Sequence, residues 1–227
     1  MKHSRRYLAN REGLDPVQVH SVSGALEILK GLRAAKFDET VEVHTRLGVD
    51  PKKSDQMVRG AVSLPHGLGK DVRVIAFAEG DMADAAREAG AIEVGSSDLA
   101  DKIAGGWMAF DIVIAHPSMM RHVGKLGRVL GPSGKMPSPK SGTVTPNVGQ
   151  AVSEFKAGKV EFRVDAAGNI HVPVGKISFS AEKLTENATA FIDYVAGLRP
   201  ATAKGAYFRN VTVTTTMGPG LRVEVKH

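Results

Sequence analysis

Two Gly-Lys pairs are the residues whose type and spacing come nearest to a phosphate-binding site. A P-loop needs a glycine, four further residues, Gly-Lys and then a serine or threonine, so that backbone amides and the lysine hold the phosphates and the hydroxyl meets Mg²⁺. Gly134-Lys135 has Val129 in place of the first glycine and Met136 where the hydroxyl is required. Gly124-Lys125 fails at the same two positions. Neither pair predicts nucleotide binding.

Other catalytic motifs are also missing. Val72 replaces the third glycine of a dinucleotide-binding fingerprint after Gly67 and Gly69, and the segment 131–134, Gly-Pro-Ser-Gly, has the wrong spacing for a nucleophile elbow. The eight histidines include no pair four residues apart and no HExxH zinc motif. We therefore predict that the protein is not an enzyme and has no metal and no cofactor. The alternative is an active site assembled from residues distant in sequence.

The composition is that of a globular protein with an anionic partner. The 227 residues are 42% apolar and carry a net charge of +6, with a pI of about 9.5, which favours nucleic acid or a membrane surface. The absence of cysteine excludes disulfides, thiolate nucleophiles and cysteine-based zinc sites, and fits a reducing cytoplasm. We find no signal-peptide block and no run of about 18–20 apolar residues that could span a membrane. The start, MKHSRRYLANR, predicts a solvated basic arm.

The positive charge is unevenly distributed. Residues 67–158 contain ten Lys or Arg and ten Asp or Glu, so the rest of the chain carries the whole excess of +6. Between Asp111 and Glu154, however, there are five cations and no acid, on a Gly/Pro-rich stretch. We call these five residues the basic loop: Arg121, Lys125, Arg128, Lys135 and Lys140. Irregular loops of this length are typically functional, so a secondary nucleic-acid contact stands beside the alternative of a solvated loop.

Two kinds of strand are expected. Residues 40–47 and 211–216 alternate apolar and polar side chains, which is typical of an antiparallel sheet with one wet face. Residues 74–78 and 112–115 are uninterrupted apolar runs, as in a parallel sheet covered on both faces. Helical segments at 81–89, 97–104 and 118–126 and a short strand at 92–94 accompany these runs. Strand and helix alternating in this way predict a doubly wound α/β unit.

Two amphipathic helices belong with the alternating strands. The first follows Ser21 or Ser23 as its cap and the second follows Ser180. Each carries an apolar stripe that we expect to be core. The stripes are Val22, Ala25, Leu26, Leu29 and Leu32 in the first helix, and Leu184, Ala188, Phe191, Ile192 and Val195 in the second.

The order of these elements predicts a chain that leaves one domain and returns to it. We expect a discontinuous domain of residues 1–66 plus 159–227, with half-buried strands, and an inserted α/β domain of residues 67–158. Hinges near 65–69 and 157–158 would let the two domains swing.

Three segments of the discontinuous part have the composition of an RNA contact. Residues 35–43 place an aromatic beside a lysine at the start of a strand, and residues 50–60 form a polar basic loop. Residues 213–220 are a threonine-rich strand that ends in a tight turn.

These segments, together with other motifs, closely resemble the L-one family of bacterial large-subunit ribosomal proteins, the stalk proteins. The other motifs are Ser63–Lys70, Gly131-Pro132 with Met136-Pro137, Pro139–Val144 and Pro173–Lys176. The likeness runs from Tyr7 to the C-terminal strand, with several motifs in the right order. It implies an α+β discontinuous RNA-binding domain with an inserted α/β Rossmann-like three-layer domain.

The resemblance also implies a function. A member of this family is a structural constituent of the large ribosomal subunit in the cytoplasm, and binds large-subunit ribosomal RNA at the mobile stalk near the transfer RNA exit site. It would assist release of deacylated transfer RNA and repress translation of its own messenger RNA. It would be a monomer apart from the ribosome, with no membrane partner.

The family's RNA contacts can be placed on this sequence where the motifs match. Threonine hydroxyls and turn amides suit ribose hydroxyls, phosphates and base edges, and apolar side chains suit ribose or base faces. Asn210 stands where the family often has serine, and it can still hydrogen-bond to ribose. The resemblance implies a strand-start cluster of Lys36, Phe37, Thr40 and Glu42 and a turn cluster of Thr216, Met217 and Gly218. The Gly/Pro-rich stretch that carries the basic loop departs from the family's usual pattern at Ser133, Lys135 and Ser138.

Plainer interpretations of the same residues remain. Phe37 could be a core residue, the threonines of residues 212–216 could simply suit an exposed strand, and residues 218–220 could be only a turn. At the level of function, a sugar- or nucleotide-dependent enzyme on the inserted domain and a free-standing RNA chaperone are the alternatives to a ribosomal component.

Overall fold

The computed structural model describes residues 3–225, and the chain folds into two compact units. Unit 1 consists of the chain up to Gly69 together with the chain from Phe162 onward, and unit 2 is Lys70–Glu161. The inserted domain with boundaries at 67 and 158, and the hinges beside it, stay a prediction.

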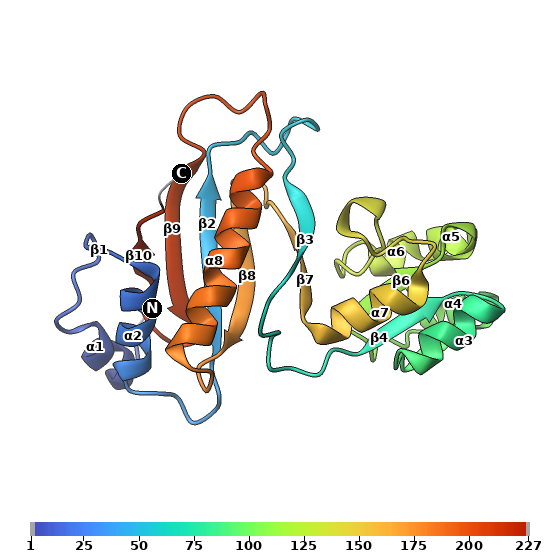
Figure 1. Cartoon of the computed structure of the whole chain (residues 1–227), viewed down its shortest axis with the longest axis horizontal. Coiled ribbons are helices and arrows are strands. Elements are labelled where there is room, and N and C mark those ends of the chain that lie inside the picture. The colour runs from blue at the N-terminus through green and yellow to red at the C-terminus, as the bar shows by residue number, and fades with distance from the viewer. Residues whose placement is uncertain (1–2, 226–227) are drawn as a thin grey trace. The chain divides into compact units, whose positions relative to one another are not determined.

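Unit 1 is built on a five-stranded sheet in the order β1-β10-β9-β2-β8 (Figure 1). Its strand β2 pairs antiparallel with β8 on one side and β9 on the other, β10 is antiparallel to β9, and β1 is parallel to β10. A separate two-stranded sheet contains β3 and β7. The strands of unit 1 are β1 (Val19–His20), β2 (Thr40–Leu47), β3 (Arg59–Ser63), β8 (Asn169–Lys176), β9 (Phe208–Thr215) and β10 (Leu221–Val223). Strand β7 (Lys159–Arg163) includes the residues at which the chain passes from unit 2 back to unit 1.

The two amphipathic helices of unit 1 pack together over one face of this sheet (Figure 1). They are α2 (Val22–Gly31), capped by Ser21, and α8 (Ala181–Gly197), capped by Ser180. The predicted stripe of α8 is fully confirmed, since all five of its residues are buried. Of the α2 stripe, Ala25, Leu26 and Leu29 are buried. The other face of the sheet is left to the polar side chains of β2 and β9, as the alternation predicted.

Unit 2 contains a three-stranded parallel sheet in the order β5-β4-β6. All four residues of β4 are buried, because helices cover both faces. Ile75 and Phe77 face α4 and α5, while the alternate residues face α3 and α7. The elements are β4 (Val74–Phe77), α3 (Asp81–Glu88), β5 (Glu93–Gly95), α4 (Ser97–Ala104), β6 (Ile112–Ala115), α5 (Met120–Val123), α6 (Gly127–Leu130) and α7 (Val148–Ala157).

The segment predicted as helix-like at about 118–126 is helical, but not as one continuous α-helix. The chain instead forms a 3₁₀ turn at Pro117–Met119, the short helix α5, a second 3₁₀ turn at Gly124–Leu126 and then α6. Gly124 and Gly127 stand at the two breaks, and glycine disfavours continuous helix by about 1 kcal/mol relative to alanine. A further 3₁₀ turn spans Pro139–Ser141.

The predicted solvated arm at the start of the chain is also wrong. Residues Arg5–Arg11 form the helix α1, whose first turn is capped by the Ser4 hydroxyl. Asn10 on this helix is buried. The arginines that suggested a free arm therefore lie on an ordered helix that packs against the rest of unit 1. Within residues 3–225, no helix is long and apolar enough to cross a membrane.

Candidate RNA-binding site

The structure brings the strand-start cluster and the turn cluster together. Thr40 opens β2, and Thr216 lies one residue beyond the end of β9. The Thr216 amide donates to the Thr40 carbonyl at 3.0 Å, and the Thr40 amide donates to the Thr216 hydroxyl oxygen at 3.0 Å. Segments distant in sequence therefore form one continuous surface at this end of the sheet.

Two large apolar side chains on this surface face solvent. Phe37 is 53% exposed and Met217 is 52% exposed. The alternative that Phe37 is a core residue is therefore wrong. Burying this phenylalanine and methionine against a partner would remove apolar surface from water and so favour binding. Lys36 is exposed beside Phe37.

The hydroxyl of Thr216 has a structural partner. It accepts from the Thr40 amide and lies 3.3 Å from the Thr40 carbonyl. The hydroxyl of Thr40 in turn accepts from Lys176 Nζ at 2.9 Å, and the same ammonium reaches the Asp38 carbonyl at 3.4 Å. The interpretation of Thr216 as a β-branched residue that merely suits a strand is incomplete, because its hydroxyl joins the two clusters.

The Thr215 side chain leaves little room for a side chain at position 218. A Cβ at this position would lie 2.2 Å from Thr215 Oγ1, far inside van der Waals contact. The Gly218 amide also donates back to the Thr215 carbonyl at 3.1 Å and closes the turn. A larger residue at this position would therefore force the Thr215 side chain to move.

The remaining predicted contacts lie along the open face of the sheet. Glu42 on β2 is in register with Thr214 and Pro173 on the two neighbouring strands, one step inward from Thr40. Asn210 is in register with Arg46 near the other end of β2. Because strands rise about 3.3 Å per residue, Asn210 lies roughly 20 Å from Thr216, and the structure does not bring it into the turn cluster.

A histidine pair occupies the middle of this open face. His44 Nδ1 lies 2.7 Å from His171 Nδ1, on neighbouring strands. Burial lowers the pKa of His44 and the neighbouring His171 lowers it further, while Glu42 opposes the shift. His44 is therefore held toward its neutral form.

Sequence reasoning missed Glu39, the residue just before β2. It is only 3% exposed. Its carboxylate accepts from the Ala35 amide at 2.8 Å and from the Met217 amide at 2.9 Å. Burial alone would raise the pKa of Glu39, but the donors from Met217, Ala35 and Thr215 and the charge of Arg6 outweigh it, so this pKa lies below its ordinary value. The signal was present, because period-2 alternation puts residue 39 on the same inward face as Val41 and Val43.

The basic loop is divided between exposed and internally bonded cations. Arg121, Lys125, Arg128 and Lys140 are exposed, although Arg121 Nε also lies 2.9 Å from His122 Nε2. Lys135 is half-buried, donates to the Phe110 carbonyl and lies 4.8 Å over the Phe110 ring. Lys135 therefore supports the fold of unit 2.

Comparisons with known proteins all match the chain to one ribosomal protein family. A profile of the ribosomal protein L1p/L10e family matches residues 29–219. The chain is 54% identical over 224 residues to the large ribosomal subunit protein uL1 of a Nocardioides species, covering 99% of this chain and 93% of that protein. It is 55% identical over 224 residues to the large ribosomal subunit protein uL1 of Cutibacterium acnes, covering 99% of this chain and 97% of that protein.

Proposed function

The chain belongs to the ribosomal protein L1p/L10e family, and from this premise we propose that unit 1 binds large-subunit ribosomal RNA through the strand-start and turn clusters. Membership makes the protein a structural, non-enzymatic constituent of the large ribosomal subunit, located with the ribosome in the cytoplasm. The RNA contact is the finer step that the geometry supports.

The observation that carries the proposal is the pair of solvent-facing apolar side chains on joined loops. Phe37 and Met217 offer flat or adaptable apolar surface to a base or ribose. On the same surface the Thr216 hydroxyl accepts from the Thr40 amide, and the Thr40 hydroxyl accepts from Lys176. Lys36 adds a cation for phosphate. Apolar stacking with a few polar contacts is how structured or unpaired RNA is recognised, and it contrasts with simple charge attraction.

The site of binding is proposed to be the mobile stalk near the transfer RNA exit site, where the protein would assist release of deacylated transfer RNA. Movement there would use the inserted domain and its predicted hinges. The basic loop is the candidate for a secondary nucleic-acid contact, through Arg121, Lys125, Arg128 and Lys140. The protein would be a monomer when it is apart from the ribosome.

The proposal is tested by rebinding to ribosomal subunits. Large subunits washed free of the protein should take up the full chain at one copy per subunit, and nuclease footprinting should show one protected segment of ribosomal RNA. A free-standing RNA chaperone would bind below stoichiometry and protect no fixed segment. That outcome would overturn the proposal.

Repression of the protein's own messenger is proposed to use the same surface. If so, the ribosomal RNA segment found by footprinting should compete with the messenger for the protein, and Met217→Ala should weaken both complexes. The exposed Met82 is a matched control, since it is 42% exposed on α3 of unit 2. Simultaneous binding of both RNAs to one protein would contradict a shared surface.

A further inference from the structure

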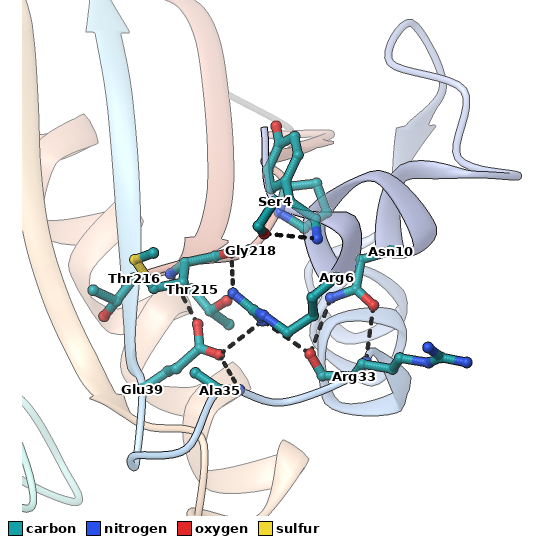
Figure 2. Close-up of polar contacts among 12 residues, drawn as sticks. Ser4, Arg6, Asn10, Arg33, Ala35, Glu39, Thr215, Thr216 and Gly218 are labelled. Carbon is teal, nitrogen blue, oxygen red and sulfur yellow. Dashed lines mark hydrogen bonds and ion pairs between the residues drawn. The ribbon is translucent and has the colours of Figure 1, made fainter. Parts of the chain in front are cut away.

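A charged network connects the N-terminal helix to both loops of the candidate RNA surface. We call it the Arg6–Glu39 network, and it consists of Arg6 and Asn10 on α1, Arg33 and Glu39 around the first loop, and Met217 in the turn. Figure 2 shows Arg6 pointing from α1 toward Glu39 and the turn at Gly218, and Asn10 pointing toward Arg33.

Both backbone polar groups of Met217 are held by this network. The Met217 amide donates to Glu39 Oε2 at 2.9 Å, and the Met217 carbonyl accepts from an Arg6 guanidinium nitrogen at 2.9 Å. The two charged side chains also approach each other at 3.4 Å. The turn backbone is therefore fixed at its centre, while the Met217 side chain is left in solvent.

The first loop is held from the same helix. The Asn10 side chain accepts from the Arg33 amide at 3.0 Å and donates to the Arg33 carbonyl at 3.0 Å, and Arg6 donates to that same carbonyl at 2.9 Å. Asn10 and Arg6 are four residues apart and so share one face of α1. Glu39 closes the other end of the loop by accepting from Ala35. Lys36 and Phe37 thus lie on a loop whose ends are both fixed.

The charges of Arg6 and Glu39 interact with partners inside the protein. Glu39 is buried and ionised, and the Arg6 side chain is 24% exposed with its donors directed to two carbonyls and a carboxylate. An arginine neutralised in this way attracts phosphate weakly compared with a free one. Its value to binding is the order that it gives to two loops, since a loop fixed before binding avoids the entropic cost of ordering.

We propose that Arg6 and Glu39 are positioning residues for RNA recognition, through which helix α1 holds the Phe37 and Met217 loops in their binding conformation before RNA arrives. The inference rests on the proposed RNA-binding function and deepens it. The arginine-rich sequence of α1 would by itself suggest direct contact with phosphate. We assign to α1 instead the positioning of the two loops.

The test compares Arg6→Ala with Arg5→Ala in the full chain. The two substitutions remove the same charge from adjacent residues of α1 and introduce the best helix former, but Arg5 is exposed. Arg6→Ala should lower affinity for the footprinted ribosomal RNA segment by about five- to thirtyfold, the cost of ordering one freed backbone residue. The slope of log affinity against log salt should stay unchanged. Arg5→Ala should change affinity less than Arg6→Ala.

A phosphate contact gives the opposite pattern. If Arg6 binds phosphate directly, its loss should flatten the salt dependence by roughly 0.7–0.9, and that result would overturn the proposal. Equal affinity of wild type and Arg6→Ala would also overturn it. Failure of the wild-type chain to bind any ribosomal RNA segment would instead defeat the proposed function, so the two failures are distinguishable.

A second measurement covers the case in which a variant is less stable. Glu39→Gln keeps the shape of the side chain but can accept only one of the two amides. Hydrogen exchange in the free, folded protein should therefore accelerate in Glu39→Gln at the Ala35 or the Met217 amide, whichever has lost its acceptor, and in Arg6→Ala at the Met217 amide, with no change in Arg5→Ala. Unchanged exchange at Met217 in Arg6→Ala, or at both amides in Glu39→Gln, would overturn the proposal without reference to RNA.

Discussion

The two units differ in what their sheets leave uncovered. In unit 1 the helices α2 and α8 cover one face, so the other face and the loops at its end remain available to a partner. In unit 2 helices cover both faces, and all of β4 is buried. A sheet covered on both sides uses its side chains for its own core, whereas one with a wet face can present a ladder of polar groups. The recognition surface that we propose therefore lies in unit 1 and its loops.

Charged groups show the same contrast. In unit 1 a buried carboxylate, Glu39, orders loops that expose Phe37 and Met217. In unit 2 an ion pair near the surface joins Arg73 and Asp111, where Arg73 Nε donates to the Asp111 carboxylate at 3.2 Å. The first arrangement is coupled to a candidate binding surface and the second is not. Substitutions in the two units should therefore separate binding from stability.

The largest effects are expected from emptying the two cores. Phe110 in unit 2 and Phe191 in unit 1 are both fully buried, and phenylalanine-to-alanine changes in cores cost about 3–5 kcal/mol. Phe110→Ala should lower thermal stability while leaving RNA affinity of the folded protein near wild type. Phe191→Ala should lower both. Thermal melts and filter binding measure this, and an equal loss of affinity in the two variants would break the comparison.

A smaller effect is expected from the loss of the Arg73–Asp111 ion pair, which depends on pH. The hydrogen bond from the Arg73 guanidinium lowers the pKa of Asp111 from its ordinary value of 3.8 to about 2. Because the folded-state pKa is the lower one, the ion pair stabilises the protein above about pH 4 and this stability is lost as the pH falls toward 2. Asp111→Asn should remove about 1–2 kcal/mol at neutral pH after allowance for solvent screening.

The RNA affinity of Asp111→Asn should be unchanged at neutral pH, in contrast to Glu39→Gln. Denaturant melts of wild type and Asp111→Asn between pH 2 and 7 measure the stability difference, which should shrink toward zero at the acid end. A difference that is constant with pH would refute the assignment of the pKa shift to the Arg73 pair.

The Thr216 hydroxyl allows an intermediate test within unit 1. Thr216→Ser keeps the oxygen that accepts from Thr40, and Thr216→Val removes it and leaves that amide without its partner. Thr216→Val should cost about 1–2 kcal/mol of stability and lower RNA affinity, whereas Thr216→Ser should retain most of both. If valine is tolerated as well as serine in melts and binding curves, the hydroxyl does not join the two clusters in solution.

The smallest effect is expected from the exposed cations of the basic loop. Replacing Lys125, Arg128 and Lys140 together by alanine should weaken cognate and unrelated RNA alike, by about threefold or less at physiological salt, because screening reduces the contribution of exposed charges. Binding curves for two RNAs at two salt concentrations measure this. A selective loss for the cognate RNA would move recognition into unit 2.

Much of the fold could be predicted because it follows from local periodicity. Val41 and Val43 alternate with polar residues, and the stripe of α8 repeats at helical spacing, so burial of these residues needed no knowledge of distant partners. The exposure of Phe37 could not be derived from pattern, since an aromatic at a strand start is equally suited to a core. Only the resemblance to a known family favoured a contact.

Glu39 and helix α1 were missed for a different reason. A buried carboxylate is stable only with its partners, and those of Glu39 lie at Arg6 and Met217, far away in sequence. No window of the sequence contains all three. Likewise we predicted a solvated arm from the arginines of α1. The sequence shows their positive charge but not the backbone carbonyls to which Arg6 donates in the fold. Tertiary hydrogen bonds of this kind are the part of a site that sequence patterns leave out.

We expect RNA recognition to depend chiefly on the apolar side chains of the two joined loops. The most direct test is the full chain with Phe37→Ala and Met217→Ala together, against a matched pair of exposed apolar residues of unit 2, Met82→Ala with Ile92→Ala. Affinities for the footprinted ribosomal RNA segment and for an unrelated structured RNA are measured at one salt concentration. We expect a loss of about five- to hundredfold for the cognate RNA alone in the loop variant, and wild-type affinity in the unit 2 variant. Wild-type discrimination by the folded loop variant would contradict it.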